Sequence, residues 1–179
     1  MYTPKTKMNT INKRVRFITQ AGLIAALYVV LTMVSDFAGL AGTNPIQFRL
    51  SEILVILPFF TPAAIPGLFI GCLIANLIKS AHPLELFGAF ATLAAAIWTY
   101  AFAITPLTKP IAKWLAPWPA VIFNVAIIPF VVRYAYGVPE SIGLLAVFVA
   151  IGQVTMCVIA GYIVLFALEK RRKAIFGLM

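Results

Sequence analysis

Long apolar runs follow one another along this chain, separated by short polar or proline-containing segments. A helix needs about 20 mainly apolar residues to cross the hydrocarbon core of a bilayer, which is roughly 30 Å thick. The pattern predicts an all-α integral membrane protein, with six transmembrane helices bundled into a single membrane domain over residues 1–179. The expected helices are residues 15–35, 48–61, 63–80, 84–105, 118–136 and 140–168.

The second expected helix, residues 48–61, is short for a full crossing. Pro58 lies near its end and Pro62 follows it. We expect this helix either to be tilted or to continue through its proline into the third helix. Residues 36–47 and 105–118 contain the Pro and Gly that end helices, and they are expected to be the longer linkers.

Composition sets the class of protein further. Hydrophobic residues make up 63% of the 179 residues and charged residues only 11%, which excludes an ordinary soluble domain. The net charge of +9 could suggest a nucleic-acid partner, but the basic residues form short clusters beside apolar spans. Membrane topology explains these clusters better, so no nucleic acid is expected.

The basic residues also predict an orientation. If the amino terminus is cytoplasmic, eleven of the fourteen Lys and Arg residues lie inside, and only Arg49, Lys79 and Arg133 lie outside. The positive-inside rule therefore predicts that both termini are cytoplasmic and that the number of spans is even. Among the acidic residues, only Glu169 is expected on the inner side.

Signatures of catalysis and of nucleotide binding are missing from the sequence. It contains no GxxxxGK[ST], HExxH or GxSxG pattern and only one histidine. We therefore expect no enzyme activity, no catalytic residues, no cofactor and no metal site. Cys72 and Cys157 lie far apart in sequence and are interpreted as small core residues.

Small residues form stripes on two expected helices. Ala21 and Ala25 lie one turn apart on the first helix, and Gly67 and Gly71 repeat this spacing on the third. Such a stripe allows another helix to approach closely. The partner of the first stripe is either a helix of the same bundle or another protein.

Charged and amide residues occur near the expected outer ends of the helices. Arg49 and Glu52 are three residues apart, so they either pair with each other or point together into one cavity. Charged side chains at membrane depth usually face a protein interior or water, although near the boundary the cost is modest and snorkelling is also possible. Asn76 and Glu85 are expected to share a vestibule with them.

Two further amides are expected at one depth. At 1.5 Å per residue, Asn124 lies about 9 Å from the inner end of the expected helix 118–136. By the same count, Gln153 lies about 20 Å from the outer end of the expected helix 140–168. In a core of about 30 Å these levels nearly coincide. The two amides either bond to each other or line the floor of a pocket.

Six blocks of this sequence resemble the queuosine-precursor transporters of the QueT type. The blocks are AGLIAALYVVLT, IQFRLSEILVILPFF, AIPGLFIGCLIANL, ELFGAFATLAAA, APWPAVIFN and GQVTMCVIAG. Proteins of this type are substrate-binding S components of energy-coupling factor (ECF) transporters. The resemblance implies a bacterial cell-membrane protein that binds its substrate from outside and has no ATPase of its own. It also implies docking on a membrane coupling protein that carries two ATP-binding-cassette ATPases.

The resemblance assigns roles to particular residues. Ala21 and Ala25 match the alanine motif that forms the coupling interface in S components, and residues 36–47 match the loop that covers the ligand.

The substrate is expected to be a 7-deazaguanine whose donor edge binds the carboxylate of Glu52 or Glu85. The full set of expected substrate-binding residues is Gln47, Arg49, Glu52, Asn76, Glu85, Asn124 and Gln153.

One position departs from the family pattern. The last helix of the family carries Gly-Glu where this chain has Gly152 and Gln153. If that carboxylate pairs with a cationic aminomethyl group, this chain is expected to prefer an uncharged precursor or queuine; if it is structural, little changes. An S component for another vitamin, a solitary permease and a membrane scaffold are the alternative functions.

Overall fold

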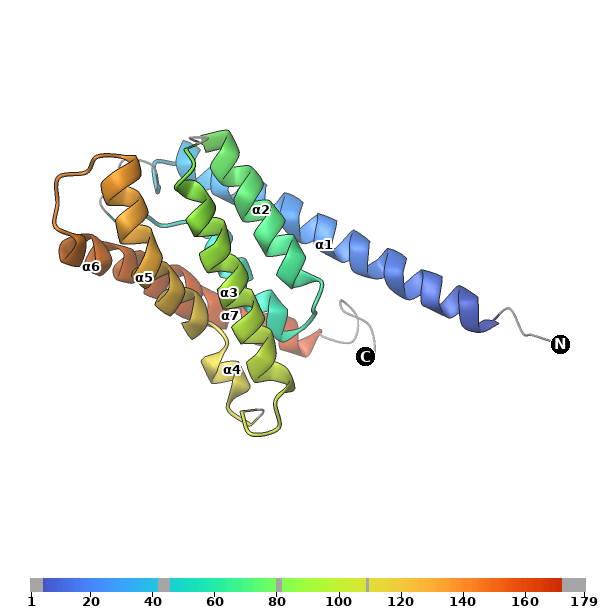
Figure 1. The fold of residues 1–179 in the computed structure, drawn as a ribbon. Helices are drawn as coiled ribbons and strands as arrows, with labels where there is room; N and C mark the ends of the chain where they lie inside the picture. Colours follow the sequence, from blue (N-terminus) through green and yellow to red (C-terminus); the bar gives the residue numbers. More distant parts are fainter. Residues whose placement is uncertain (1–4, 42–45, 80–81, 109, 172–179) are drawn as a thin grey trace.

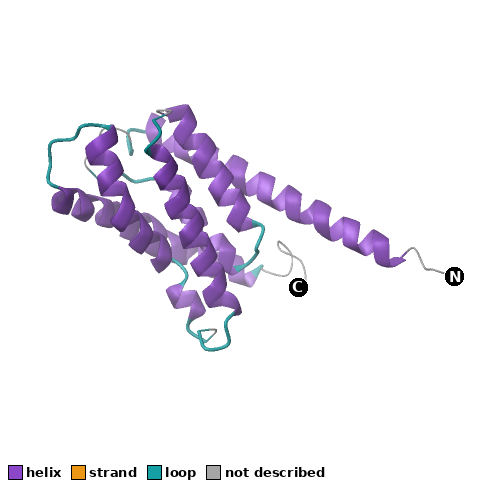
Figure 2. Ribbon diagram, in the orientation of Figure 1, coloured by secondary structure: helices purple, strands orange, loops and turns teal. Residues whose placement is uncertain are grey.

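The structure is a computed structural model, and it describes residues 5–41, 46–79, 82–108 and 110–171. Every regular element in this part of the chain is a helix, and Figure 2 shows no strand there. The predicted all-α class is therefore confirmed. The elements are α1 (Lys5–Phe37), the 3-10 helix η1 (Leu50–Phe59), α2 (Ala64–Lys79), α3 (Glu85–Ile104), α4 (Ala112–Leu115), α5 (Trp118–Ala135), α6 (Ile142–Gln153), the π-helical segment η2 (Val154–Ala160) and α7 (Gly161–Lys170).

Within the described residues, four stretches of helix are long and apolar enough to cross a membrane. They are Asn12–Phe37, Glu85–Ile104, Ala112–Ala135 and Ile142–Lys170. The last of these runs through α6, η2 and α7, so these three elements form one continuous helical stretch. Two shorter apolar helices, η1 and α2, lie between the first long helix and the second. The count of six spans and the side of the membrane on which the termini lie stay predictions.

The expected second helix takes an unusual form. Within residues 48–61 the chain forms η1, a ten-residue 3-10 helix that contains Pro58 and ends at Phe59. It does not continue into the next helix, because a turn at residues 60–63 separates it from α2. A 3-10 helix rises about 2.0 Å per residue, so η1 extends roughly 20 Å and is longer than an α-helix of the same residue count.

The helices pack in sequence order around η1. α1 packs against α2, α2 against α3, α3 against α5, and α5 against α6, while η1 contacts α1, α2, α3, α7 and η2. Figure 1 shows that the amino-terminal part of α1 extends beyond the rest of the bundle. The carboxyl ends of α2 and α5 lie near the carboxyl end of α1, whereas the carboxyl end of α7 lies toward the opposite end of the bundle.

Glycines allow α1 and α2 to approach closely. A Cβ atom on Gly67 would lie 2.8 Å from the Ala21 carbonyl oxygen, and one on Gly71 would lie 2.9 Å from the Ala25 carbonyl oxygen. The two predicted small-residue stripes therefore face each other inside one bundle. Ala25 is buried and Ala21 is half-buried at this contact.

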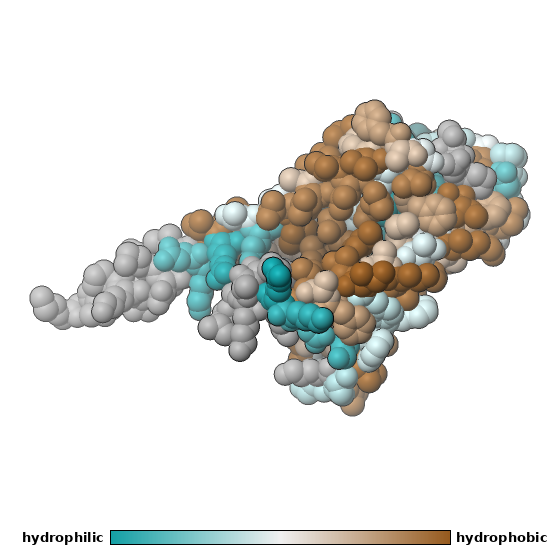
Figure 3. Space-filling view, turned by 180° about the vertical axis from the view of Figure 1, so that it is seen from behind, coloured by the Kyte–Doolittle hydropathy of each residue, from teal (hydrophilic) through white to brown (hydrophobic). Residues whose placement is uncertain are grey.

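The outer surface of the bundle is apolar. In Figure 3 hydrophobic side chains cover much of the face, and hydrophilic residues gather near the grey ends of the chain. Exposed large side chains include Leu23, Ile97, Ile122 and Ile163. Exposed leucine and isoleucine on every side of a bundle are typical of a protein whose solvent is lipid.

Candidate functional site

A small polar cavity lies among η1, α2, α3, α5 and α6. It is lined by Gln47, Arg49, Glu52, Cys72, Gly88, Thr92, Asn124, Ile128, Val149 and Gln153. The space open to the centre of a water molecule is about 20 Å³. A site of this size has room for about one water molecule, so a two-ring ligand requires its walls to move outward.

Glu52 is the buried carboxylate of this cavity and is only 3% exposed. Its Oε1 accepts a 2.9 Å hydrogen bond from the Tyr28 hydroxyl, and its Oε2 accepts one of 3.4 Å from Asn124 Nδ2. A carboxylate has about four acceptor positions, so these two bonds leave further positions for a ligand. Glu52 is thus held in place by Tyr28 and Asn124 and can still accept hydrogen bonds from a ligand.

Arg49 precedes η1 and lines the same cavity as Glu52. Its Nη2 donates a 3.3 Å hydrogen bond to Gln47 Oε1. Arg49 and Glu52 do not form an ion pair with each other. Within the described residues, the ion pair is between Lys79 and Asp36, at 3.4 Å. Of the two arrangements considered for Arg49 and Glu52, the structure has the one in which they face a shared cavity.

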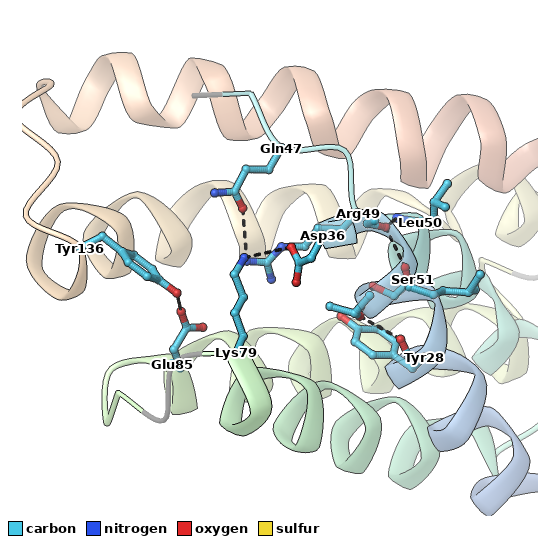
Figure 4. Close-up of polar contacts among 12 residues, drawn as sticks. Tyr28, Asp36, Gln47, Arg49, Leu50, Ser51, Lys79, Glu85 and Tyr136 are labelled. Atoms are coloured by element: carbon cyan, nitrogen blue, oxygen red, sulfur yellow. Dashed lines mark hydrogen bonds and ion pairs between the residues drawn. The ribbon is translucent and has the colours of Figure 1, made fainter. Parts of the chain in front are cut away.

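The residues around Arg49 form a polar cluster. Figure 4 shows Asp36, Gln47, Arg49 and Lys79 pointing toward one another from the ends of α1 and α2 and from the segment before η1. Two members of this cluster, Gln47 and Arg49, also line the cavity. The central part of the expected covering loop, residues 42–45, lies outside the described residues.

A stripe of polar residues on α1 fixes η1 in place. The Thr32 hydroxyl lies 2.9 Å from the Ser51 hydroxyl, and the Ser35 hydroxyl accepts a 2.8 Å hydrogen bond from the Leu50 backbone N–H. Tyr28, Thr32 and Ser35 recur every three or four positions, so they lie on one face of α1. That face holds Glu52 at the cavity.

Asn76 and Glu85 lie outside the cavity lining, in contrast to the vestibule expected from the sequence. Asn76 Nδ2 donates a 3.0 Å hydrogen bond to the backbone carbonyl of Glu85, which joins the end of α2 to the start of α3. The Glu85 carboxylate accepts a hydrogen bond from the Tyr136 hydroxyl, as Figure 4 shows. The structure therefore brings together five of the seven expected substrate-binding residues.

Asn124 and Gln153 both line the cavity, but they make different bonds. Asn124 donates to Glu52, whereas Gln153 Oε1 accepts a 3.0 Å hydrogen bond from the Cys157 thiol. Gln153 is the last residue of α6, and Cys157 lies in η2, which begins at the next residue. π-helical segments inside α-helices occur often at functional sites.

Sequence reasoning missed two residues that support the site. Tyr28 is 1% exposed and Cys157 is fully buried, and both contact the cavity residues Glu52 or Gln153. The signal for Tyr28 was its place in the polar stripe Tyr28, Thr32 and Ser35 on an otherwise apolar helix. The spacing of Gln153 and Cys157, one helical turn apart, was the signal for Cys157.

Among the described residues, no aromatic side chain lines the cavity. Phe87, Trp98 and Tyr134 are each more than half exposed, and neither they nor Phe48 lines the cavity. Phe87 and Tyr134 line an apolar groove between α3 and α5 instead. Their placement suits a surface in contact with lipid.

The apolar bundle and its enclosed polar cavity define an α-helical membrane protein. A sequence model of the QueT transporter family matches residues 18–170, and this chain belongs to that family. The Queuosine precursor transporter QueT of Lactococcus lactis subsp. cremoris (strain MG1363) is similar to this chain, with 37% identity over 76 residues. The match covers 42% of this chain and 44% of that relative, so it spans less than half of the relative's length. No solved structure matches the chain significantly.

Proposed function

We propose that this chain is the substrate-binding S component of an ECF importer and that it binds a queuosine precursor of the 7-deazaguanine class. Membership in the QueT transporter family and the printed name of the Lactococcus relative support the substrate class. The observation that carries the proposal is the buried Glu52 carboxylate, which faces a polar cavity inside an apolar helical bundle. An ionisable group in such a position is by default a candidate functional residue.

In the proposed complex, Glu52 recognises the donor edge of the base. The ring N–H and the exocyclic amine of a 7-deazaguanine are adjacent donors, and a carboxylate offers two matched acceptors. Arg49 orients this edge or donates to the ring oxygen, and Gln47, Asn124 and Gln153 bind the remaining polar atoms. Glu85 and Asn76 support the site from outside, through Tyr136 and through the α2–α3 junction.

Ligand entry requires the cavity to widen. Small-molecule sites commonly have volumes of about 300–1,000 Å³, well above the space enclosed here. Residues 46–49 form one wall of the cavity and connect to η1 without regular secondary structure. We propose that this segment moves outward to admit the ligand.

For coupling, we propose that α1 docks on a membrane coupling protein that carries two ATP-binding-cassette ATPases. Ala21 and Ala25 are the expected interface, yet both pack against α2. The neighbouring small residues Gly22 and Ala26 are exposed, and a Cβ on Gly22 would meet nothing within 4 Å. The docking surface that we propose therefore includes Gly22 and Ala26 beside the original pair.

The same proposal includes six spans, with both termini on the cytoplasmic side of the bacterial cell membrane. The described basic residues at the two ends support this orientation, because Lys13, Arg14, Arg16, Lys170 and Arg171 are exposed near the termini. The positive-inside rule places such clusters in the cytoplasm.

Direct binding to the purified full chain tests the proposed substrate. We expect selective binding of 7-deazaguanines over riboflavin in calorimetry, and at least a tenfold weaker affinity for Glu52→Gln. Glu169→Gln is the matched control, because Glu169 is exposed on α7 and lies outside the cavity lining. Equal affinity of Glu52→Gln and the unmodified chain would overturn the site, and binding of riboflavin alone would indicate an S component for another vitamin.

Coexpression tests the coupled mechanism. We expect substrate uptake only when the coupling protein and both ATPases are present, because the sequence has no phosphate-binding loop. Uptake by the chain alone would identify a solitary permease and overturn the proposed S-component role.

A further inference from the structure

The thiol of Cys157 fixes the orientation of an amide in the cavity wall. Its Sγ lies 3.0 Å from Gln153 Oε1 and 4.0 Å from Glu52 Oε2. The shorter of these contacts makes Gln153 Oε1 the acceptor of the thiol proton. Cys157 is fully buried, so this bond is shielded from competing water.

This bond decides which end of the Gln153 amide is available to a ligand. An amide has one acceptor oxygen and one donor nitrogen, and the oxygen is already engaged. Gln153 lines the cavity, and among the described residues its Nε2 has no hydrogen-bond partner. Gln153 therefore presents a donor to the cavity, and a ligand atom placed there has to be an acceptor.

The charges of the cavity wall also favour a neutral ligand. Arg49 is the cation and Glu52 the anion among the described lining residues, so the wall is balanced before any ligand binds. The neighbouring carboxylates do not line the cavity: Asp36 pairs with Lys79, and Glu85 accepts a hydrogen bond from Tyr136. A cationic ligand would thus bring a positive charge that no lining residue is left to balance, and such a charge is costly in the interior of a membrane protein.

We infer that Cys157 and Gln153 together make this site selective for a neutral ligand that carries a hydrogen-bond acceptor at the position facing Gln153. The inference rests on the proposed function and concerns the substituent of the deazaguanine. A nitrile is neutral and accepts a hydrogen bond, whereas an aminomethyl group is an ammonium cation at neutral pH and can only donate. The cavity therefore takes the cyano compound in preference to the aminomethyl compound.

Three ligands test this selectivity on the purified full chain. They are 7-cyano-7-deazaguanine, 7-aminomethyl-7-deazaguanine and unsubstituted 7-deazaguanine, each measured by calorimetry at neutral pH. We expect the cyano compound to bind at least about tenfold more tightly than the aminomethyl compound, with the unsubstituted base between them.

Variants at the two positions separate this role from simple packing. Gln153→Glu has nearly the same shape but adds an anion, so it should reverse the preference toward the aminomethyl compound. Cys157→Ala frees the amide to turn its oxygen toward the cavity, and the affinity ratio should fall several-fold toward one. Cys157→Ser is the matched control, because its hydroxyl still donates to Gln153 Oε1 and should keep the preference.

The outcomes distinguish this inference from the proposed function. Binding of the aminomethyl compound as tightly as the cyano compound would overturn the inference and leave the deazaguanine site standing. An affinity ratio unchanged in both Cys157→Ala and Gln153→Glu would do the same. If none of the three compounds binds, the proposed substrate class itself fails. Melting temperatures of all variants in detergent show whether a loss of affinity comes from misfolding.

Discussion

The Tyr28 hydroxyl donates a 2.9 Å hydrogen bond to Glu52 Oε1, and thereby joins the middle of α1 to the carboxylate of the candidate site. The same tyrosine packs on α2, because a Cβ atom on Gly71 would lie 2.7 Å from Tyr28 Cβ. Tyr28 therefore contacts both the α1–α2 interface and the cavity. A displacement of α1 along α2 would therefore also displace the hydroxyl that holds the Glu52 carboxylate.

Tyr28→Phe should weaken ligand binding while the fold is retained. The variant keeps the ring and its packing but removes the donor to a buried carboxylate, a bond worth about 1.5–3 kcal/mol. The expected loss of affinity is about tenfold or more, measured by calorimetry. In a Glu52→Gln background the same change should have a much smaller effect, because the two residues act through one bond. Equal losses in both backgrounds would contradict this positioning role.

Much of this architecture could be predicted from the sequence, because the depth of a residue in the membrane follows from the rise per residue and its helix face follows from the residue spacing. Arg49 and Glu52, three residues apart, were expected on one side of a helix; Glu52 lies in the first turn of η1, Arg49 is the extended residue directly before it, and both line the cavity. The level of Asn124 and Gln153 followed from the rise per residue, and both line the cavity.

The remaining features depend on how helices rotate and pack, which counting does not give. Asn76 and Glu85 lie at a suitable depth, but their bonds join α2, α3 and the end of α5 outside the cavity. Tyr28 and Cys157 look like ordinary apolar positions until neighbouring elements bring Glu52 and Gln153 against them. The 3-10 form of η1 was also hidden, because an apolar run with one proline is compatible with a short α-helix.

Gly71→Ala should destabilise the fold through the α1–α2 contact. The added methyl group would lie 2.9 Å from the Ala25 carbonyl oxygen and 3.0 Å from Ala25 Cα, so α1 has to shift. Overpacking of this kind lowers the free energy of unfolding by about 1–3 kcal/mol. Gly22→Ala is the matched control, because its Cβ would meet nothing within 4 Å and alanine favours the helix. A Gly71→Ala protein that melts at or above the temperature of Gly22→Ala would contradict the close packing.

Gly152→Ala should impair ligand binding through the segment before η1. A Cβ on Gly152 would collide with the backbone carbonyl of Gln47, so residues 46–49 would have to move away from α6. That movement displaces Gln47 and Arg49, which line the cavity, and we expect at least a tenfold loss of affinity.

The control for this prediction is Gly143→Ala. Gly143 lies at the start of the same helix, and its Cβ would meet nothing within 4 Å. It should bind ligand like the unmodified chain. Unchanged calorimetric affinity for Gly152→Ala would show that the segment is not held in the position that binding requires.

Bulky residues on the open face of α1 should block coupling but spare ligand binding. Gly22→Trp combined with Ala26→Trp fills an exposed surface that lies one residue beyond the Ala21 and Ala25 contacts with α2. Close approach of a partner helix needs small residues, so the coupling protein should no longer copurify and ATP-dependent uptake should be lost. Ile97→Trp on α3 is the control, since that side chain is already 49% exposed and large. Undiminished copurification of the double variant would exclude this face of α1, and loss of ligand binding by the same variant would indicate disturbed folding rather than blocked docking.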